Sequence, residues 1–282
     1  MVTVGRHEVD REMTKSLNGF RITRTPATTA GAPVVLLIHG FLDDASVWDG
    51  VVDALSGEAG SVRYDLPGFG TRSGSIADAG TPTLASLAAE AGDIVEGIDG
   101  PVIVVGQSLG AQIAELVAAQ HSDRVRGLVL LAPVPLGGTQ LPDEAVAPFA
   151  ALGGDRVTQR RLRAEISPHL SDEQLDRLTD VGAVATPDVT AHYVALWNNG
   201  VSDVAATSAF GGPVLVIRGG ADGFVTEQAV DAISARFVDP DVKLVAKGGH
   251  WLHVEYPGSI ATMILDFADA IVEAPSPVDA EG

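Results

Sequence analysis

The sequence predicts an α/β fold in which helices cover both faces of a mostly parallel β-sheet. Four short apolar runs without polar alternation are typical of strands buried on both faces. They are residues 34–38, 102–105, 128–131 and 214–217. Helical patterns lie between these runs, and strands that alternate with helices predict right-handed βαβ units and an open parallel sheet.

Each helical pattern has apolar residues three and four positions apart, which form a single stripe on the helix. The patterns cover residues 84–98, 109–117 and 260–271. Weaker strand candidates lie at residues 19–24, 62–65 and 242–246.

The alternation breaks between Val134 and Phe210. Ser171 opens a capping-box sequence, and Thr186 before Pro187 is typical of a helix start. We therefore expect residues 134–210 to form a helical cap inserted into the sheet domain. Residues 1–133 and 211–282 should form that core domain.

Composition limits the partners and cofactors. The 282 residues include 18 Lys and Arg and 37 Asp and Glu, a formal net charge of −19, which disfavours nucleic acid and anionic membranes. Without cysteine, thiol nucleophiles and Cys-ligated metals are excluded. No apolar run approaches the roughly 18 residues of a membrane span, and residues 1–10 carry no apolar signal segment. We expect a cytoplasmic protein.

The segment Gly106-Gln107-Ser108-Leu109-Gly110 carries the candidate nucleophile. It lies between a buried strand and an amphipathic helix, the context of a sharp turn that projects a serine hydroxyl above a sheet. The helix start supplies free N–H groups beside the serine. A glycine-rich turn without catalytic role is the alternative.

A serine needs a base, and that base needs a carboxylate. His250 follows Gly249 after the last strand candidate, and Asp222 follows the strand at residues 214–217. Both would lie at the carboxyl edge of the sheet with Ser108. His253 is the rival base, and a metal site at the two histidines is a weaker alternative, so we expect no metal.

An acyl-transfer site also needs donors for the developing oxyanion. The backbone N–H of Leu109 is one candidate, and that of Phe41 is the other, because Gly40 lets the loop after residues 34–38 turn inward. His39 is expected to hold this loop in place. The ring of Phe41 would line the acyl pocket.

Two charged clusters are expected to be solvated. Asp43 and Asp44 precede a helix and would face water at its start. Arginines in the insertion would form a solvated helix face, with an anionic-substrate gate as the alternative. They are Arg156, Arg160, Arg161 and Arg163.

Together these motifs resemble those of the α/β-hydrolase superfamily, in the single-domain branch of serine esterases, haloperoxidases and C–C-bond hydrolases. The matching segments are residues 37–41, 65–70, 106–110, 219–222 and 249–250. The resemblance implies an eight-stranded, mostly parallel sheet with a helical cap after the sixth strand. It also implies a catalytic triad of Ser108, Asp222 and His250.

The predicted function is therefore hydrolysis of a small-molecule carboxylic ester through an acyl-enzyme, with no cofactor. Alternatives on the same fold are a C–C-bond hydrolase of ring-cleavage products, a lactonase, a haloperoxidase-like perhydrolase and, more remotely, a non-catalytic ligand receptor. Candidate substrate-pocket residues are apolar or aromatic. They are Phe41, Val134, Phe149, Tyr193, Trp197 and Trp251.

Overall fold

The computed structural model describes residues 13–17 and 19–273, and in this part of the chain the strands form an eight-stranded sheet in the order β1-β2-β4-β3-β5-β6-β7-β8. The strands are β1 (Met13–Leu17), β2 (Phe20–Thr25), β3 (Val34–Ile38), β4 (Gly60–Tyr64), β5 (Val102–Gln107), β6 (Val125–Leu131), β7 (Val214–Gly219) and β8 (Asp241–Val245). Strand β2 is antiparallel to both of its neighbours, and β4, β3 and β5 to β8 run parallel. The predicted mostly parallel α/β sheet is confirmed.

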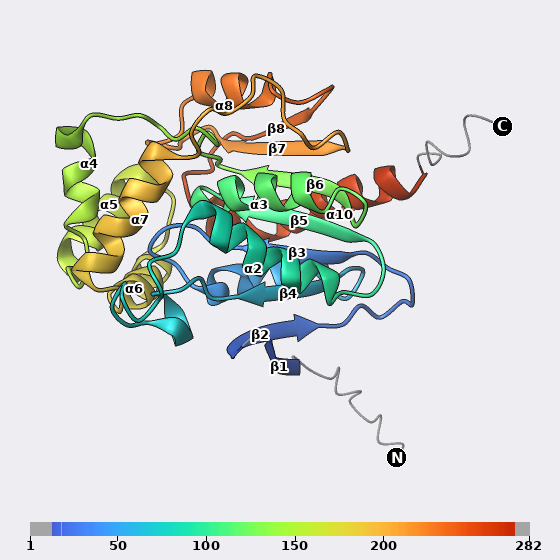
Figure 1. Cartoon of the computed structure of the whole chain (residues 1–282), viewed down its shortest axis with the longest axis horizontal. Helices are drawn as coiled ribbons and strands as arrows, with labels where there is room; N and C mark the ends of the chain where they lie inside the picture. The colour runs from blue at the N-terminus through green and yellow to red at the C-terminus, as the bar shows by residue number, and fades with distance from the viewer. Residues whose placement is uncertain (1–12, 18, 274–282) are drawn as a thin grey trace, which may run out of the picture.

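Helices cover both faces of the sheet (Figure 1). On one face lie α2 (Leu84–Glu96), α3 (Leu109–Gln120) and α8 (Glu227–Ser234), and on the other lie α1 (Asp49–Leu55) and α10 (Pro257–Glu273). Short helical turns are η1 (Ala45–Trp48), η2 (Gly70–Arg72) and α9 (Leu252–Glu255).

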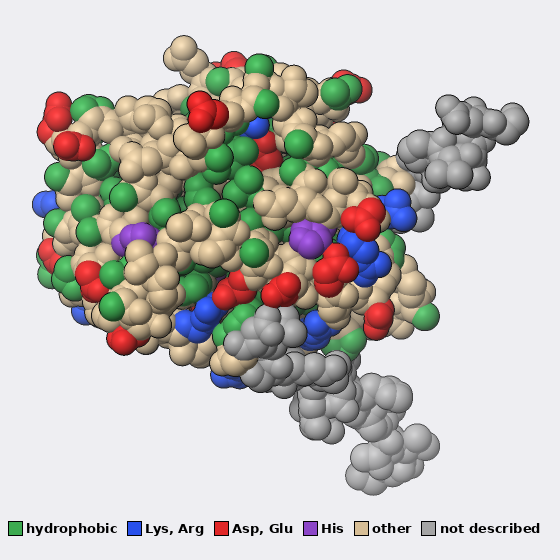
Figure 2. Space-filling view, in the orientation of Figure 1, with side chains coloured by type: hydrophobic (Ala, Val, Ile, Leu, Met, Phe, Trp, Pro, Cys, Tyr) green, Lys and Arg blue, Asp and Glu red, His purple; other side chains and the backbone are tan. Residues whose placement is uncertain are grey.

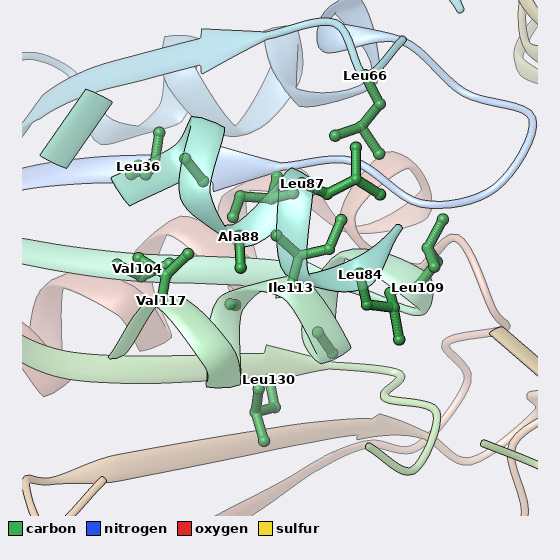
Figure 3. Close-up of a cluster of buried hydrophobic side chains, with 14 of the residues drawn as sticks. Leu36, Leu66, Leu84, Leu87, Ala88, Val104, Leu109, Ile113, Val117 and Leu130 are labelled. Carbon is green, nitrogen blue, oxygen red and sulfur yellow. The ribbon is translucent and has the colours of Figure 1, made fainter. Parts of the chain in front are cut away.

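Alternation along the central strands divides the core into two layers. Leu36 and Ile38 of β3 face the α2 and α3 side, whereas Val35 and Leu37 face α1 and α10. Figure 3 shows Leu36 in the first layer, packed with side chains of β5, α2 and α3. Because both faces of the strand are buried, its sequence is a continuous apolar run.

Four further helices lie between β6 and β7 in the described part of the chain. They are α4 (Asp143–Ala150), α5 (Arg156–Ile166), α6 (Asp172–Gly182) and α7 (Pro187–Asn199). Figure 1 shows them grouped at the end of the sheet where β6 and β7 finish. The predicted capping box is present, with the Ser171 hydroxyl accepting from the Gln174 N–H. Below, "the insertion" means residues 134–210.

Strand β1 was not predicted, because its sequence MTKSL contains no apolar run or clear alternation. It pairs with β2 alone and lies at the edge of the sheet. The segment 1–10, expected to lack a signal peptide, lies outside the described residues.

Within the described residues, no helix combines the length and the apolar character that crossing a membrane requires. On the face shown in Figure 2, lysine and arginine side chains lie singly or beside acidic ones rather than in a continuous basic patch.

Candidate active site

Ser108 sits in a strained turn between β5 and α3. Its backbone φ of 53° with ψ of −117° is a conformation that side-chain-bearing residues rarely adopt. The turn is tight: a Cβ on Gly106 would lie 2.0 Å from the Gly110 carbonyl oxygen, and one on Gly110 would lie 2.4 Å from the Ile38 carbonyl oxygen. Both glycines are therefore required by close backbone contacts.

Asp222 and His250 are brought together after β7 and β8. The Nδ1 atom of His250 lies 3.0 Å from Oδ2 of Asp222, and both side chains are buried. The other carboxylate oxygen accepts the backbone N–H groups of Phe224 and Val225 at 2.8 and 2.9 Å. A carboxylate held in this way fixes a proton on Nδ1 and leaves Nε2 of His250 able to act as a base.

The loop of His250 is joined to the turn of Ser108 through Gln107. The Nε2 group of Gln107 donates a hydrogen bond of 3.1 Å to the His250 carbonyl oxygen. The hydroxyl of Ser108 makes no hydrogen bond to His250 among the contacts of the described residues. Asp222 and His250 are thus in direct contact, whereas Ser108 is connected to the histidine loop through the adjacent residue, Gln107. The hydrogen bonds of catalytic groups are often long before substrate binds.

The loop after β3 packs against the same turn. A Cβ on Gly40 would lie 2.1 Å from Oε1 and 3.1 Å from the backbone carbonyl oxygen of Gln107, so this glycine allows the loop to approach the residue before Ser108. His39 holds the loop from the other side: its Nε2 accepts the Leu66 N–H at 2.9 Å, and its Nδ1 lies 2.8 Å from the Gly40 carbonyl oxygen. His39 therefore has the structural role that the sequence predicts.

A chain of aromatic rings runs from the insertion to His250. Trp197 of α7 contacts Phe41 and Phe149, with ring centroids 6.5 and 5.7 Å apart. Phe224 contacts Trp197 at 5.5 Å and His250 at 5.5 Å. Below, "the aromatic cluster" means Phe41, Phe149, Trp197 and Phe224. Phe224 was missed from the sequence, although its place two residues after Asp222 could have indicated it.

Three other pocket candidates have different surroundings. The buried Tyr193 hydroxyl donates to the Pro67 carbonyl oxygen at 2.7 Å, and its ring packs on Phe69 at 4.8 Å. Val134 is buried in the hydrophobic layer of α2 and α3. Trp251 lies on the opposite layer, although its ring also contacts His250 at 5.2 Å.

His253, the rival base, is separated from this chemistry. It is fully buried, its ring lies 4.5 Å from that of Trp48, and neither ring nitrogen has a hydrogen-bond partner. Burial, with a smaller contribution from the charge of His250, lowers the pKa of His253 to about 3. No group of three potential metal ligands occurs in residues 13–17 and 19–273, so the described chain offers no metal cluster here.

Two of the charged residues expected to be solvated are buried. Asp43 is 1% exposed and Arg163 is 0% exposed, and they form an ion pair with an N–O distance of 3.0 Å. That expectation was wrong for them, because each supplies the other with a partner inside the protein. Arg160 fits it, since its exposed side chain pairs with Asp172 and Asp176.

The sequence and the fold are similar to those of known proteins. The chain is similar to Esterase Rv0045c of Mycobacterium tuberculosis, with 28% identity over 260 residues that cover 84% of this chain and 83% of that protein. It is also similar to the pimeloyl-(acyl-carrier protein) methyl ester esterase of Nitrosomonas europaea, with 36% identity over 108 residues that cover 38% of this chain and 40% of that protein.

The bromoperoxidase of Bacillus anthracis has a similar fold, with a TM-score of 0.75 and 20% sequence identity over 92% of this chain and 100% of that chain. The model of a family described as the alpha/beta hydrolase family matches residues 35–262. This match spans most of the sequence and includes Ser108, Asp222 and His250. The chain therefore belongs to the alpha/beta hydrolase family.

Proposed function

We propose that this protein is a serine hydrolase that cleaves a small carboxylic ester through a catalytic triad of Ser108, His250 and Asp222. The observation that carries the proposal is the buried hydrogen bond between His250 and Asp222, with the strained turn of Ser108 packed against the same histidine loop. The names of two relatives, both esterases, favour ester hydrolysis within the family.

In this mechanism, Nε2 of His250 takes the proton of the Ser108 hydroxyl as its oxygen attacks the ester carbonyl carbon. The imidazolium is stabilised by Asp222, whose charge is held by two backbone N–H groups. His250 then gives the proton to the leaving alcohol as the acyl-enzyme forms. Water, deprotonated by His250, attacks the acyl group in turn, and the departing Ser108 oxygen recovers the proton.

The oxyanion would be bound by the backbone N–H groups of Leu109 and Phe41. Leu109 is the first residue of α3, where a backbone N–H has no partner within the helix. Neither N–H group donates to a side chain or carbonyl in the described part of the chain. Two free donors on a rigid turn and its neighbouring loop suit a charge that develops only in the transition state.

The aromatic cluster favours an uncharged acyl group of modest size. Phe149, Trp197 and Phe224 pack edge to face, and Phe224 packs edge to face on His250, so the surroundings of the base are apolar on this side. We further propose that the insertion acts as a cap that supplies Phe149 and Trp197 to this pocket. The substrate would be a small-molecule ester in the cytoplasm.

The test is hydrolysis of p-nitrophenyl acetate by the wild type and by Ser108→Ala, with a fluorophosphonate probe as a second measurement. We expect turnover and stoichiometric labelling of Ser108 in the wild type and neither in the variant, which should keep the wild-type circular dichroism spectrum. Equal turnover by the folded variant would remove Ser108 from the mechanism. A wild type that neither hydrolyses nor labels would favour a non-catalytic receptor.

A substrate panel defines the reaction further. Simple esters, a lactone and a diketo ring-cleavage product are compared by kcat/KM, because specificity is a ratio of these values. We expect the esters to be hydrolysed with the highest kcat/KM. A higher value for the ring-cleavage product would assign C–C-bond hydrolysis instead.

A further inference from the structure

Arg163 is a buried charge that the proposed mechanism does not use, yet it contacts both loops that the mechanism needs. It lies on α5 in the insertion, and its side chain is fully buried against the sheet domain. We infer that Arg163 is a positioning residue. It holds two loops in the relative placement that catalysis requires: the loop after β3 that carries Phe41, called the oxyanion loop, and the loop after β8 that carries His250, called the histidine loop. This inference rests on the proposed function.

The first half of the arrangement concerns the oxyanion loop. Nη1 of Arg163 lies 3.0 Å from Oδ1 of Asp43, and Nη2 donates to the Leu42 carbonyl oxygen at 2.7 Å. Leu42 has a φ of 65°, in the left-handed region. It directly follows Phe41, the proposed oxyanion donor, so the guanidinium restrains the backbone next to that N–H.

The second half concerns the histidine loop. The guanidinium carbon of Arg163 lies 4.5 Å from the ring centroid of Trp251, and Nε1 of that ring donates to Oδ2 of Asp43 at 2.8 Å. Trp251 follows His250 in the chain. The Asp43 carboxylate therefore binds both Arg163 and Trp251, and in this way it connects the oxyanion loop to the histidine loop.

The carboxyl end of α5 adds two backbone contacts to the same loop. The carbonyl oxygen of Ile166 accepts the His250 N–H at 3.1 Å, and the hydroxyl of Ser167 accepts the Trp251 N–H at 2.8 Å. The helix that carries Arg163 thus holds the backbone of the base directly. All of these groups are buried, so water does not compete for the bonds.

The geometry of the guanidinium explains why arginine suits this position. Its planar array of N–H groups reaches a carboxylate and a carbonyl oxygen at once while its face covers an indole ring. An ammonium group offers no flat face and no fixed spacing between donors. Small errors in the placement of catalytic groups are costly, since a shift of about 1 Å lowers a rate by roughly a hundredfold.

The experiment separates positioning from stability by removing both buried charges together. In the double variant Arg163→Met with Asp43→Asn, neither partner is left as an unpaired charge, and the asparagine carbonyl can still accept the Trp251 Nε1–H. Its kcat and KM for p-nitrophenyl acetate, and its rate of fluorophosphonate labelling, are measured well below the midpoint of its thermal unfolding.

We expect kcat and the labelling rate to fall by about a hundredfold while KM changes by less than about threefold. Arg163→Lys retains the positive charge beside Asp43. Its thermal unfolding midpoint should be close to that of the wild type, but its kcat should be as low as that of the double variant. The matched control is Arg160→Met on the same helix, because the exposed side chain of Arg160 pairs with Asp172 and Asp176 of the insertion. It should have wild-type kcat.

A folded double variant with kcat within threefold of the wild type would overturn the inference, as would full recovery of kcat in Arg163→Lys. Neither result would affect the proposed function, which depends on the wild type and on Ser108→Ala. A wild type without turnover or labelling would instead refute the proposed function. The wild type is therefore assayed before any variant of Arg163.

Discussion

Acid should lower the free energy of unfolding of this protein in part through His253. The burial of this side chain allows the size of the decrease to be calculated. The imidazole is fully buried against Trp48, and neither nitrogen has a partner. Burial lowers its pKa from 6.5 to about 3 in the folded protein. The unfolded chain therefore binds a proton more tightly, and stability is lost as the pH falls through this window.

The size of the effect follows from the two pKa values. The stability is fully present above the unfolded value of 6.5 and declines until the folded value of about 3 is reached. Since one pKa unit corresponds to about 1.4 kcal/mol, His253 alone should lower the free energy of unfolding by about 2 kcal/mol between pH 7 and pH 5.

Urea denaturation at both pH values measures this loss in the wild type and in His253→Leu. The leucine has a similar volume and cannot titrate, so the variant should stay within about 1.5 kcal/mol of the wild type at pH 7. At pH 5 it should gain about 2 kcal/mol relative to the wild type, because only the wild type loses this contribution. Comparing two proteins removes the shared contribution of the carboxylates.

The matched control is His169→Leu, which removes an exposed imidazole. Its loss of stability between pH 7 and pH 5 should be closer to that of the wild type than to that of His253→Leu. If the difference in unfolding free energy between wild type and His253→Leu were the same at both pH values, the buried neutral histidine would not be a source of acid sensitivity.

Three further changes test the site. Asp222→Asn should lower kcat by about ten-thousandfold, because the amide NH₂ would face Nδ1 of His250 and favour the wrong tautomer; a kcat within tenfold would contradict this. Gly110→Ala should lower the free energy of unfolding by about 3 kcal/mol or more, since its Cβ would lie 2.4 Å from the Ile38 carbonyl oxygen; an unchanged urea midpoint would disprove the clash. Phe149→Ala should raise the kcat/KM ratio of p-nitrophenyl hexanoate to acetate by about tenfold, and an unchanged ratio would place the acyl chain elsewhere.

The central strands could be predicted because burial on both faces leaves a continuous apolar run, as in Val34–Ile38. The triad candidates could be chosen because Ser108 and Asp222 follow such strands and His250 follows a weaker strand candidate, each at a glycine-containing turn, and the carboxyl ends of parallel strands meet at one edge. The contact between His250 and Asp222, separated by 28 residues, follows from that topology.

The buried ion pair could not be predicted by the same rules. The buried face of α5 consists of Gln159, Arg163 and Ile166, so two of its three inward positions are polar. The distribution of apolar residues along α5 therefore does not indicate which side of the helix is buried. The spacing of four and then three residues was present, but only the partner, Asp43, makes the burial of Arg163 intelligible.

The contacts at the end of α5 bear on how such a protein could change its specificity. The backbone N–H groups of His250 and Trp251 are hydrogen-bonded to Ile166 and Ser167. A chimera in which the whole insertion is replaced by that of a related protein would lose these two hydrogen bonds. A chimera designed to change specificity should therefore keep the native residues at the end of α5 and exchange only α4 and α7.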